Sequence, residues 1–324
     1  MASQPMRNTD SAETRKPPDV SLDGYRRKSR EDSVPAILLG AGSVLLHLIL
    51  LVSDVISFSD LFHSLFFIIG VVGLAGGAWE YYRANSLTEE DLRKYKAAQE
   101  FARTVEKTAL TYTKAVLGCL IAVAIFQLLA GEEKSIRAAG LVKDAVRGGE
   151  IWRLATCATL HVNFMHIWMN SQSLLGFGKL IESLTDRAYL PLVFLPSAAC
   201  GSVFSLVLMP ETTSVGASGG LMGLVGFLAV LGYRRKEMLP EGFFKSILVN
   251  ICFIGVIGLA GFAIIDNAAH LGGLAAGVAC GQLLIGKSEG TNIADASSLV
   301  RGLGLTALLA IALISLLSII MISK

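Results

Sequence analysis

The sequence predicts an all-α fold, a polytopic bundle of membrane-spanning helices. Only 17% of its 324 residues are charged and 53% are hydrophobic, whereas soluble proteins average about 25% charged residues. The hydrophobic residues also gather into nine long runs, and about 20 mostly apolar residues suffice for a helix to cross a bilayer. The runs cover residues 35–56, 61–79, 110–131, 156–180, 189–209, 216–233, 245–264, 267–286 and 302–322.

The N-terminal segment, residues 1–34, is polar and is predicted to be a disordered cytoplasmic tail. Its basic residues directly precede the first apolar run, which we expect to act as an uncleaved insertion signal. These residues are Arg26, Arg27, Lys28 and Arg30. Residues 35–109 then form a two-span hairpin and a polar connector helix over 87–108, where Thr88 and Asp91 resemble a capping box.

The distribution of Lys and Arg orients the spans, because cytoplasmic loops carry an excess of positive charge. With the N-terminus in the cytoplasm, the outer connections at 57–60, 210–215 and 265–266 contain no Lys or Arg. The exception is the outer loop 132–155, which contains five basic residues and is long enough to hold folded, partly membrane-immersed structure. The protein is therefore predicted to be a multi-pass integral protein of the plasma (inner) membrane.

Residues 110–286 contain six of the nine runs and are predicted to form the functional core. The later runs of this core are rich in Gly, Ala and Ser, which favours close helix packing in lipid. Residues 287–324 add a linker and one extra C-terminal span. No internal repeat is evident, which argues against a transporter built from inverted halves.

Polar residues inside membrane spans are expensive, so each is a candidate for function. The first group is His161, His166 and Asn170, within the run 156–180. If this run is one helix, His166 and Asn170 share a face while His161 lies about 140° away. That spacing is awkward for two histidines that share a metal. The same residues are also consistent with hydrogen bonds that only pack helices together.

Two further candidates lie near the starts of their spans. Ser218 stands in SVGASGGLMG, where glycines leave its hydroxyl uncovered, although such glycines also suit plain helix packing. His270 stands in DNAAHLGGLAAG, with Gly273 and Gly277 on the same stripe of the helix. A single histidine of this kind is equally consistent with a structural role.

The expected depths of these residues support a shared site. At about 1.5 Å per helical residue, Ser218 and His270 lie roughly 3–6 Å from the outer ends of their spans. His166 and Asn170 lie roughly 15–20 Å along theirs. A nucleophile, a base and oxyanion donors, the set that acyl transfer needs, can therefore meet in the outer half of the bundle.

Together, these motifs resemble the rhomboid protease family over about 110–286. The matching residues, in chain order, are Trp152 and Arg153 (WR), His161, His166 and Asn170 (HxxxxHxxxN), 216–219 (GxSG) and 269–277 (AHxxGxxxG). The resemblance implies a six-helix core, to which the two N-terminal spans and the last span are additions. It also implies that Trp152 and Arg153 anchor the outer loop without taking part in the chemistry.

The resemblance further implies that Ser218 is the nucleophile and His270 the general base, without an obligatory carboxylate. The oxyanion is then stabilised by His166, Asn170 and the backbone N–H of Ser218, and the cavity is lined by His161, Gly216 and Met222. Met222 departs from the family, which usually has an aromatic residue there for the base to stack on. Asp266 either orients His270, as in a triad, or caps the last core helix.

The function predicted from this resemblance is an intramembrane serine endopeptidase that cleaves transmembrane substrates near the outer membrane face. Its expected partners are transmembrane protein substrates and the lipid bilayer, and no nucleic acid, metal or organic cofactor is expected. The first alternative is a non-catalytic rhomboid-like protein that binds membrane helices. The second is a transporter or channel, which predicts polar groups that continue to the inner side. The sequence indicates neither the substrate nor the oligomeric state.

Overall fold

The computed structural model describes residues 21–261, 265–286 and 296–324. Throughout these residues the regular structure is helical, as predicted, apart from one isolated bridge between Leu141 and Ser214. The chain divides into two compact units, residues 1–93 and 94–324. The predicted tail up to residue 20 and the linker at 287–295 lie outside the described residues.

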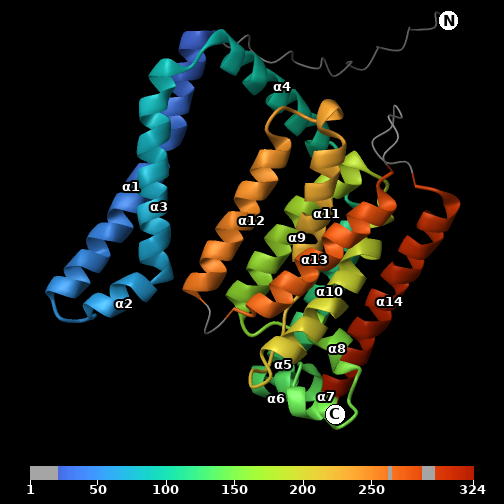
Figure 1. Cartoon of the computed structure of the whole chain (residues 1–324). Coiled ribbons are helices and arrows are strands. Elements are labelled where there is room, and N and C mark those ends of the chain that lie inside the picture. The colour runs from blue at the N-terminus through green and yellow to red at the C-terminus, as the bar shows by residue number, and fades with distance from the viewer. Residues whose placement is uncertain (1–20, 262–264, 287–295) are drawn as a thin grey trace, which may run out of the picture. The chain divides into compact units, whose positions relative to one another are not determined.

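The first unit is a helical hairpin. Its elements are α1 (Leu22–Val52), α2 (Phe58–His63), α3 (Leu65–Arg83) and η1 (Ala84–Ser86). α1 and α3 lie side by side and antiparallel, joined through α2 (Figure 1). Gly40 permits the close approach of the two helices, because a Cβ at this position would lie only 2.5 Å from the Leu74 backbone nitrogen. His47 Nε2 and Ser64 Oγ, 2.6 Å apart, join the two helices near the turn.

The prediction of a disordered tail up to residue 34 is wrong for its last part, because α1 begins at Leu22. Ser21 caps the helix by accepting a hydrogen bond from the Gly24 amide, at 3.2 Å. The Arg26 guanidinium donates to the Leu87 carbonyl oxygen at 2.7 and 3.1 Å. The polar composition of this segment therefore reflects a capped and tethered helix end.

The polar connector is confirmed as helix α4 (Glu89–Glu106), which crosses the boundary between the two units. Its capping box is also confirmed. The Thr88 amide donates to Asp91 Oδ2 at 2.8 Å, and the Asp91 amide donates to Thr88 Oγ1 at 3.3 Å. Within the second unit, Lys94 forms an ion pair with Glu241 at 2.9 Å.

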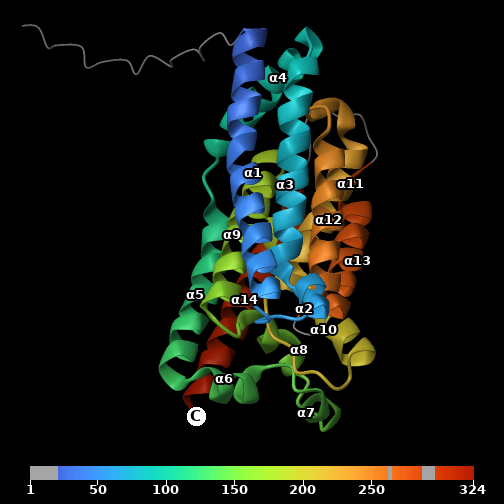
Figure 2. The ribbon, with the colours of Figure 1, turned by 90° about the vertical axis from the view of Figure 1, so that its left-hand side faces the viewer.

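The second unit contains the predicted core and the last predicted span. Its long helices are α5 (Thr111–Ala130), α9 (Phe164–Leu184), α10 (Tyr189–Leu208), α11 (Ser218–Arg234), α12 (Phe243–Ala260), α13 (Asn267–Leu284) and α14 (Ser298–Ser323). α11 is surrounded by α9, α10, α12 and α13, and every residue from 219 to 232 is buried. α14 packs along α5 and α10 and belongs to the same compact unit (Figure 2).

The loop 132–155, which is predicted to be on the outer side, is folded, as predicted. It contains α6 (Glu132–Ala139) and α7 (Lys143–Arg147), and α8 (Arg153–Thr156) and η2 (Cys157–Thr159) lead from it towards α9. α6 packs against the ends of α5 and α14 (Figures 1 and 2).

In the described part of the chain, five helices are long and apolar enough to cross a membrane. They are α1, α5, α10, α12 and α14. α9 and α13 fall on predicted runs as well, but their polar and glycine residues make them less apolar. α11 also falls on a predicted run, and it is apolar but shorter than these five helices. The multi-pass helical architecture is thus confirmed, whereas the number of nine spans stays a prediction.

Candidate active site

Helices α11 and α13 run parallel and touch through glycines. A Cβ on Gly273 would lie 2.0 Å from the Gly219 carbonyl oxygen, and one on Gly277 would lie 1.9 Å from the Gly223 oxygen. No side chain fits at such distances, so glycine at these positions permits the contact. Because the contact pairs advance by four residues on both helices, the two helices point in the same direction.

This register brings Ser218 and His270 to neighbouring first turns. Ser218 is the first residue of α11, directly before Gly219, and His270 lies three residues before Gly273 on α13. An ideal Cβ on Gly219 would lie 3.5 Å from the carbonyl oxygen of Ala269. Both Ser218 and His270 are partly buried. The two residues predicted as nucleophile and base thus lie at the same level of adjacent helices.

The predicted helix over 156–180 is wrong at its start, and this changes the position of the two histidines. α9 begins only at Phe164, where the Asn163 side chain caps it by accepting from the His166 amide at 2.8 Å. His161 lies in the preceding loop, and its ring meets His166 edge-on with centroids 5.0 Å apart. The expected separation of about 140° therefore does not apply, because the residues do not share a helix.

The depth expected for His166 is corrected for the same reason. His166 lies in the first turn of α9, about 3 Å from the helix start, and not 15–20 Å along it. Asn170 lies one turn further on and is buried. The first turns of α9, α11 and α13 therefore carry His166, Ser218 and His270, and Asn170 follows one turn later on α9.

Gly216 joins this group through its backbone conformation. Its φ of +132° is rarely adopted by residues with a side chain. A Cβ at this position would lie 2.8 Å from His166 Cε1 and 2.9 Å from Nε2. The Gly216 amide donates to the Cys157 carbonyl oxygen at 2.9 Å. The loop segment that leads to Ser218 is thereby held between the His166 ring and the η2 turn.

Several polar atoms in this region have unused hydrogen-bonding capacity. Both ring nitrogens of His161 and Nδ1 of His166 are buried without a hydrogen-bond partner among the described residues. Asn170 Nδ2 donates to the His166 carbonyl at 2.9 Å, which leaves its second hydrogen available. The amide of Ser218 belongs to the first turn of α11, where helical amides have no partner within the helix. In the described residues, no group of three or more His, Cys, Asp or Glu side chains is arranged to hold a metal.

Comparison with known proteins gives a consistent result. A family model described as the Rhomboid domain matches residues 148–287. The chain is 32% identical over 145 residues to the putative rhomboid protease YdcA of Bacillus subtilis, covering 44% of this chain and 72% of that protein. It is 36% identical over 132 residues to the rhomboid protease GluP of the same species, covering 40% of this chain and 25% of that protein.

The chain belongs to the rhomboid family. It is also 35% identical over 151 residues to RHOMBOID-like protein 6, mitochondrial, of Arabidopsis thaliana, covering 44% of this chain and 47% of that protein. The chain thus spans less than half the length of RHOMBOID-like protein 6 and a quarter of the length of GluP. The rhomboid match includes α9 to α13, while α5 and α14 lie outside it.

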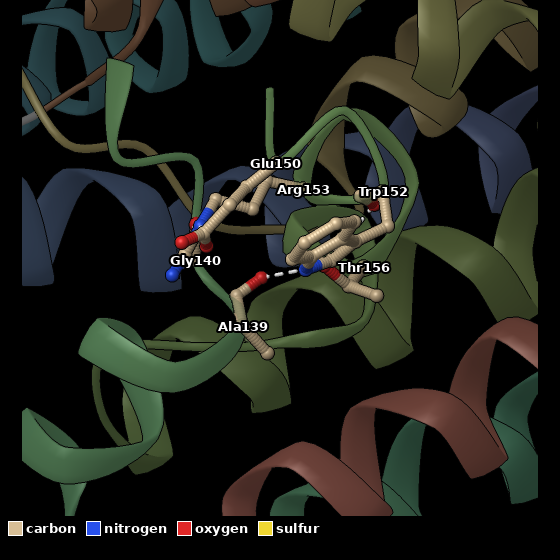
Figure 3. Close-up of polar contacts among 6 residues, drawn as sticks. All are labelled: Ala139, Gly140, Glu150, Trp152, Arg153 and Thr156. Carbon is tan, nitrogen blue, oxygen red and sulfur yellow. Dashed lines mark hydrogen bonds and ion pairs between the residues drawn. The ribbon is translucent and has the colours of Figure 1, made fainter. Parts of the chain in front are cut away.

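Arg153, of the Trp152 and Arg153 pair, holds together the loop 132–155 of this rhomboid protein. Arg153 is buried, and its guanidinium donates to Glu150 Oε2 at 2.7 Å and to the Gly140 carbonyl at 2.8 Å (Figure 3). Trp152 remains 38% exposed. Arg153 thus connects two parts of the loop to each other, and the anchoring of this loop at the membrane interface by Trp152 and Arg153 stays a prediction.

The sequence interpretation missed two residues that support the site. Gln127 on α5 is buried, donates to the His161 carbonyl at 3.0 Å and accepts from the His161 amide at 2.9 Å. Its signal was a single amide in an otherwise apolar run. Lys143 in α7 is also buried, with 3% of its surface exposed. No sequence signal distinguished Lys143 from the other lysines and arginines of the loop.

Asp266 is the N-cap of α13 and its side chain accepts a hydrogen bond from the Ala269 amide at 2.9 Å, which is one of the two roles considered for it.

Proposed function

We propose that this rhomboid-family protein is an intramembrane serine endopeptidase that cleaves transmembrane substrates with Ser218 and His270. The observation that supports this most directly is the parallel glycine contact of α11 and α13, which brings both residues to adjacent first turns. Relatives named as rhomboid proteases support the same class of activity.

In the proposed reaction, His270 accepts the hydroxyl proton of Ser218 while the serine oxygen attacks the carbonyl carbon of the scissile bond. The protonated His270 then gives this proton to the leaving amine, and an acyl-enzyme remains. Water, deprotonated by His270, attacks the ester and releases the second product with regeneration of the Ser218 hydroxyl.

The oxyanion formed at the carbonyl is proposed to be stabilised by the Ser218 amide, His166 and Asn170. The positive end of the α11 dipole adds to this, because unpaired first-turn amides attract negative charge. Each well-placed donor contributes about 3–4 kcal/mol to transition-state stabilisation. The unpaired ring nitrogens of His161 are suited to hold the water that hydrolysis needs, and we propose that His161, Gly216 and Met222 line the cavity of the site.

Access to this site defines the proposed substrate. A helical peptide bond shields its carbonyl, so a transmembrane substrate has to unwind locally before attack. Small or helix-breaking residues near the cut lower the cost of unwinding. We place the opening of the site on the outer side of the plasma (inner) membrane, with the N-terminus in the cytoplasm, because of the loop charges.

The test is labelling of the purified protein with a fluorophosphonate, which reacts only with an activated serine. Wild type should be labelled at Ser218 and should cleave a transmembrane reporter. Ser218→Ala and His270→Ala should lose both reactions while keeping the helical content of wild type. Ser246→Ala, at an exposed position on α12, is the matched control and should retain both.

The opposite result favours a non-catalytic rhomboid-like protein that binds membrane helices. Wild type would then bind the reporter without labelling or cleavage, and Ser218→Ala would bind it equally. Cleavage that persists in Ser218→Ala would exclude Ser218 as the nucleophile. Comparison of released ectodomains between cells with wild type and Ser218→Ala identifies the substrates.

A further inference from the structure

Lys143 places a buried cation next to the two helices of the proposed dyad. Its side chain, in α7 of the outer loop, is 3% exposed. The ammonium donates to Ser205 Oγ on α10 at 2.8 Å and to Ser214 Oγ at 2.7 Å, in the loop before α11. Burying an ammonium is costly unless it is paired with a charge and hydrogen-bonded.

The compensating charge is the carboxylate of Asp266. The Ser205 hydroxyl accepts from Lys143 and donates to Asp266 Oδ2, so one hydroxyl joins the two charges. Asp266 Oδ1 accepts from the Ala269 amide at 2.9 Å and caps the helix that carries His270. Burial lowers the pKa of Lys143 below its ordinary value, and the negative charge of Asp266 opposes this shift.

This chain of contacts also reaches the segment that leads to Ser218. Ser214 lies four residues before Ser218 and pairs with Leu141 of the outer loop through two backbone hydrogen bonds, at 2.9 and 3.3 Å. Lys143 therefore contacts the approach to α11 directly and the first turn of α13 through Ser205. No other charged side chain in the described residues has hydrogen bonds to both Ser205 and Ser214.

We propose that Lys143 is a positioning residue for the dyad: its ammonium compensates Asp266 through Ser205 and fixes the start of α13 against the loop that precedes Ser218. Without the cation, the Asp266 carboxylate is left partly buried without a counter-charge, and the first turn of α13 shifts or frays to hydrate it. This inference rests on the proposed protease function, although its structural part is measurable without catalysis.

The experiment compares Lys143→Met, Asp266→Asn and the double variant in the full-length protein. Lys143→Met removes the charge at similar length and should lower kcat and the rate of Ser218 labelling about tenfold, since small misplacements of catalytic groups are costly. KM should stay unchanged. Asp266→Asn should lower the rate no more than about threefold, because asparagine is also a good N-cap. The Lys143 amine, whose pKa is lowered by burial and raised by Asp266, can lose its proton once that carboxylate is removed.

The double variant gives the decisive comparison. It carries no charge at positions 143 and 266, so it should recover most of the rate that Lys143→Met loses. If Lys143 only packs the loop, the double variant will be no faster than Lys143→Met, and the proposal is overturned. Lys134→Met is the matched control, because Lys134 is an exposed lysine of the same loop, and it should match wild type.

Hydrogen exchange separates this inference from the protease proposal. Amides at 266–270 should exchange faster in Lys143→Met than in wild type and slow again in the double variant. Unchanged exchange in Lys143→Met overturns the positioning role, whether or not wild type labels. If wild type fails to label while the exchange pattern is as expected, only the protease proposal fails. If Lys143→Met does not fold, recovery of folded protein by adding Asp266→Asn supports the proposal, and no recovery overturns it.

Discussion

Gly216 has two roles that no other residue type combines. Its φ of +132° bends the chain towards Ser218, and its missing side chain leaves room for the His166 ring. The amide bond to the Cys157 carbonyl fixes this bend from the other side. A single position thereby controls the distance between the predicted oxyanion donor and the predicted nucleophile.

Gly216→Ala should therefore damage the site more than the fold. The new methyl group meets His166 at 2.8 Å and the backbone is strained at this φ, so the imidazole is displaced. We expect a fall of about 100-fold in the labelling rate, measured with the fluorophosphonate and accompanied by a small change in thermal stability. Gly149→Ala is the control, since its φ of +107° is also strained but no atom lies within 4 Å of its Cβ. Equal losses in both variants would contradict the role of the His166 contact.

At this scale, the sequence predicts residues whose chemistry is unusual for their surroundings. Ser218 and His270 stand out because polar groups among glycines in apolar runs need an explanation. Gln127 and Lys143 could not be assigned, because their importance comes from partners 34 and 62 positions away in the chain. The contact between His161 and His166 was missed because one helix was assumed where a loop and a helix are present.

At the scale of elements, the pairing of α11 with α13 depends on an uninterrupted glycine contact. Gly277 lies seven residues after His270 on α13, so its contact with α11 is about two helical turns away from the predicted catalytic residues. Its neighbour is backbone, the Gly223 carbonyl oxygen, which cannot rotate away as a side chain could. A methyl group here has to separate the two helices.

Gly277→Ala should lower both stability and activity. Overpacking of this kind typically costs about 1–3 kcal/mol, and separation of the helices also moves Ser218 away from His270. The free energy of unfolding and the rate of labelling should fall together, with denaturant titration and the fluorophosphonate as the two measurements. Gly302→Ala on α14, where no atom lies within 4 Å of the new Cβ, should leave both unchanged. Loss of stability with full labelling would show that the contact does not set the site.

Helix starts were less predictable than helix positions. The apolar run at 156–180 begins before α9 because Cys157, Ala158 and Leu160 are buried in a turn and not in a span. Apolar composition reports burial in either setting, so only the Asn163 cap marks the true start. The start of α1 was predicted too late in the chain, whereas the start of α9 was predicted too early. The charged residues at 22–34 belong to α1, although their composition is typical of a disordered tail.

At the scale of the whole molecule, the candidate residues lie within one compact unit. The main hydrophobic core of residues 94–324 extends from α4 and α5 to α14, with α11 at its centre. The order of the elements was predictable because each long apolar run coincides with one long helix over most of its length. The inclusion of α14 in this unit was not, since it depends on contacts such as Thr159 Oγ1 with Ser318 Oγ at 2.9 Å.

A chain that starts at Leu87 should therefore keep the site. It retains the capping box of α4 and loses both predicted N-terminal spans, an even number, so the predicted orientation of the remaining spans is preserved. Because a compact unit with its own core is expected to fold alone, the fragment should label at Ser218 within about threefold of the full-length rate. The same fragment with Ser218→Ala serves as the control for specific labelling. A folded fragment that does not label, beside a full-length protein that does, would mean that residues before Leu87 contribute to the chemistry.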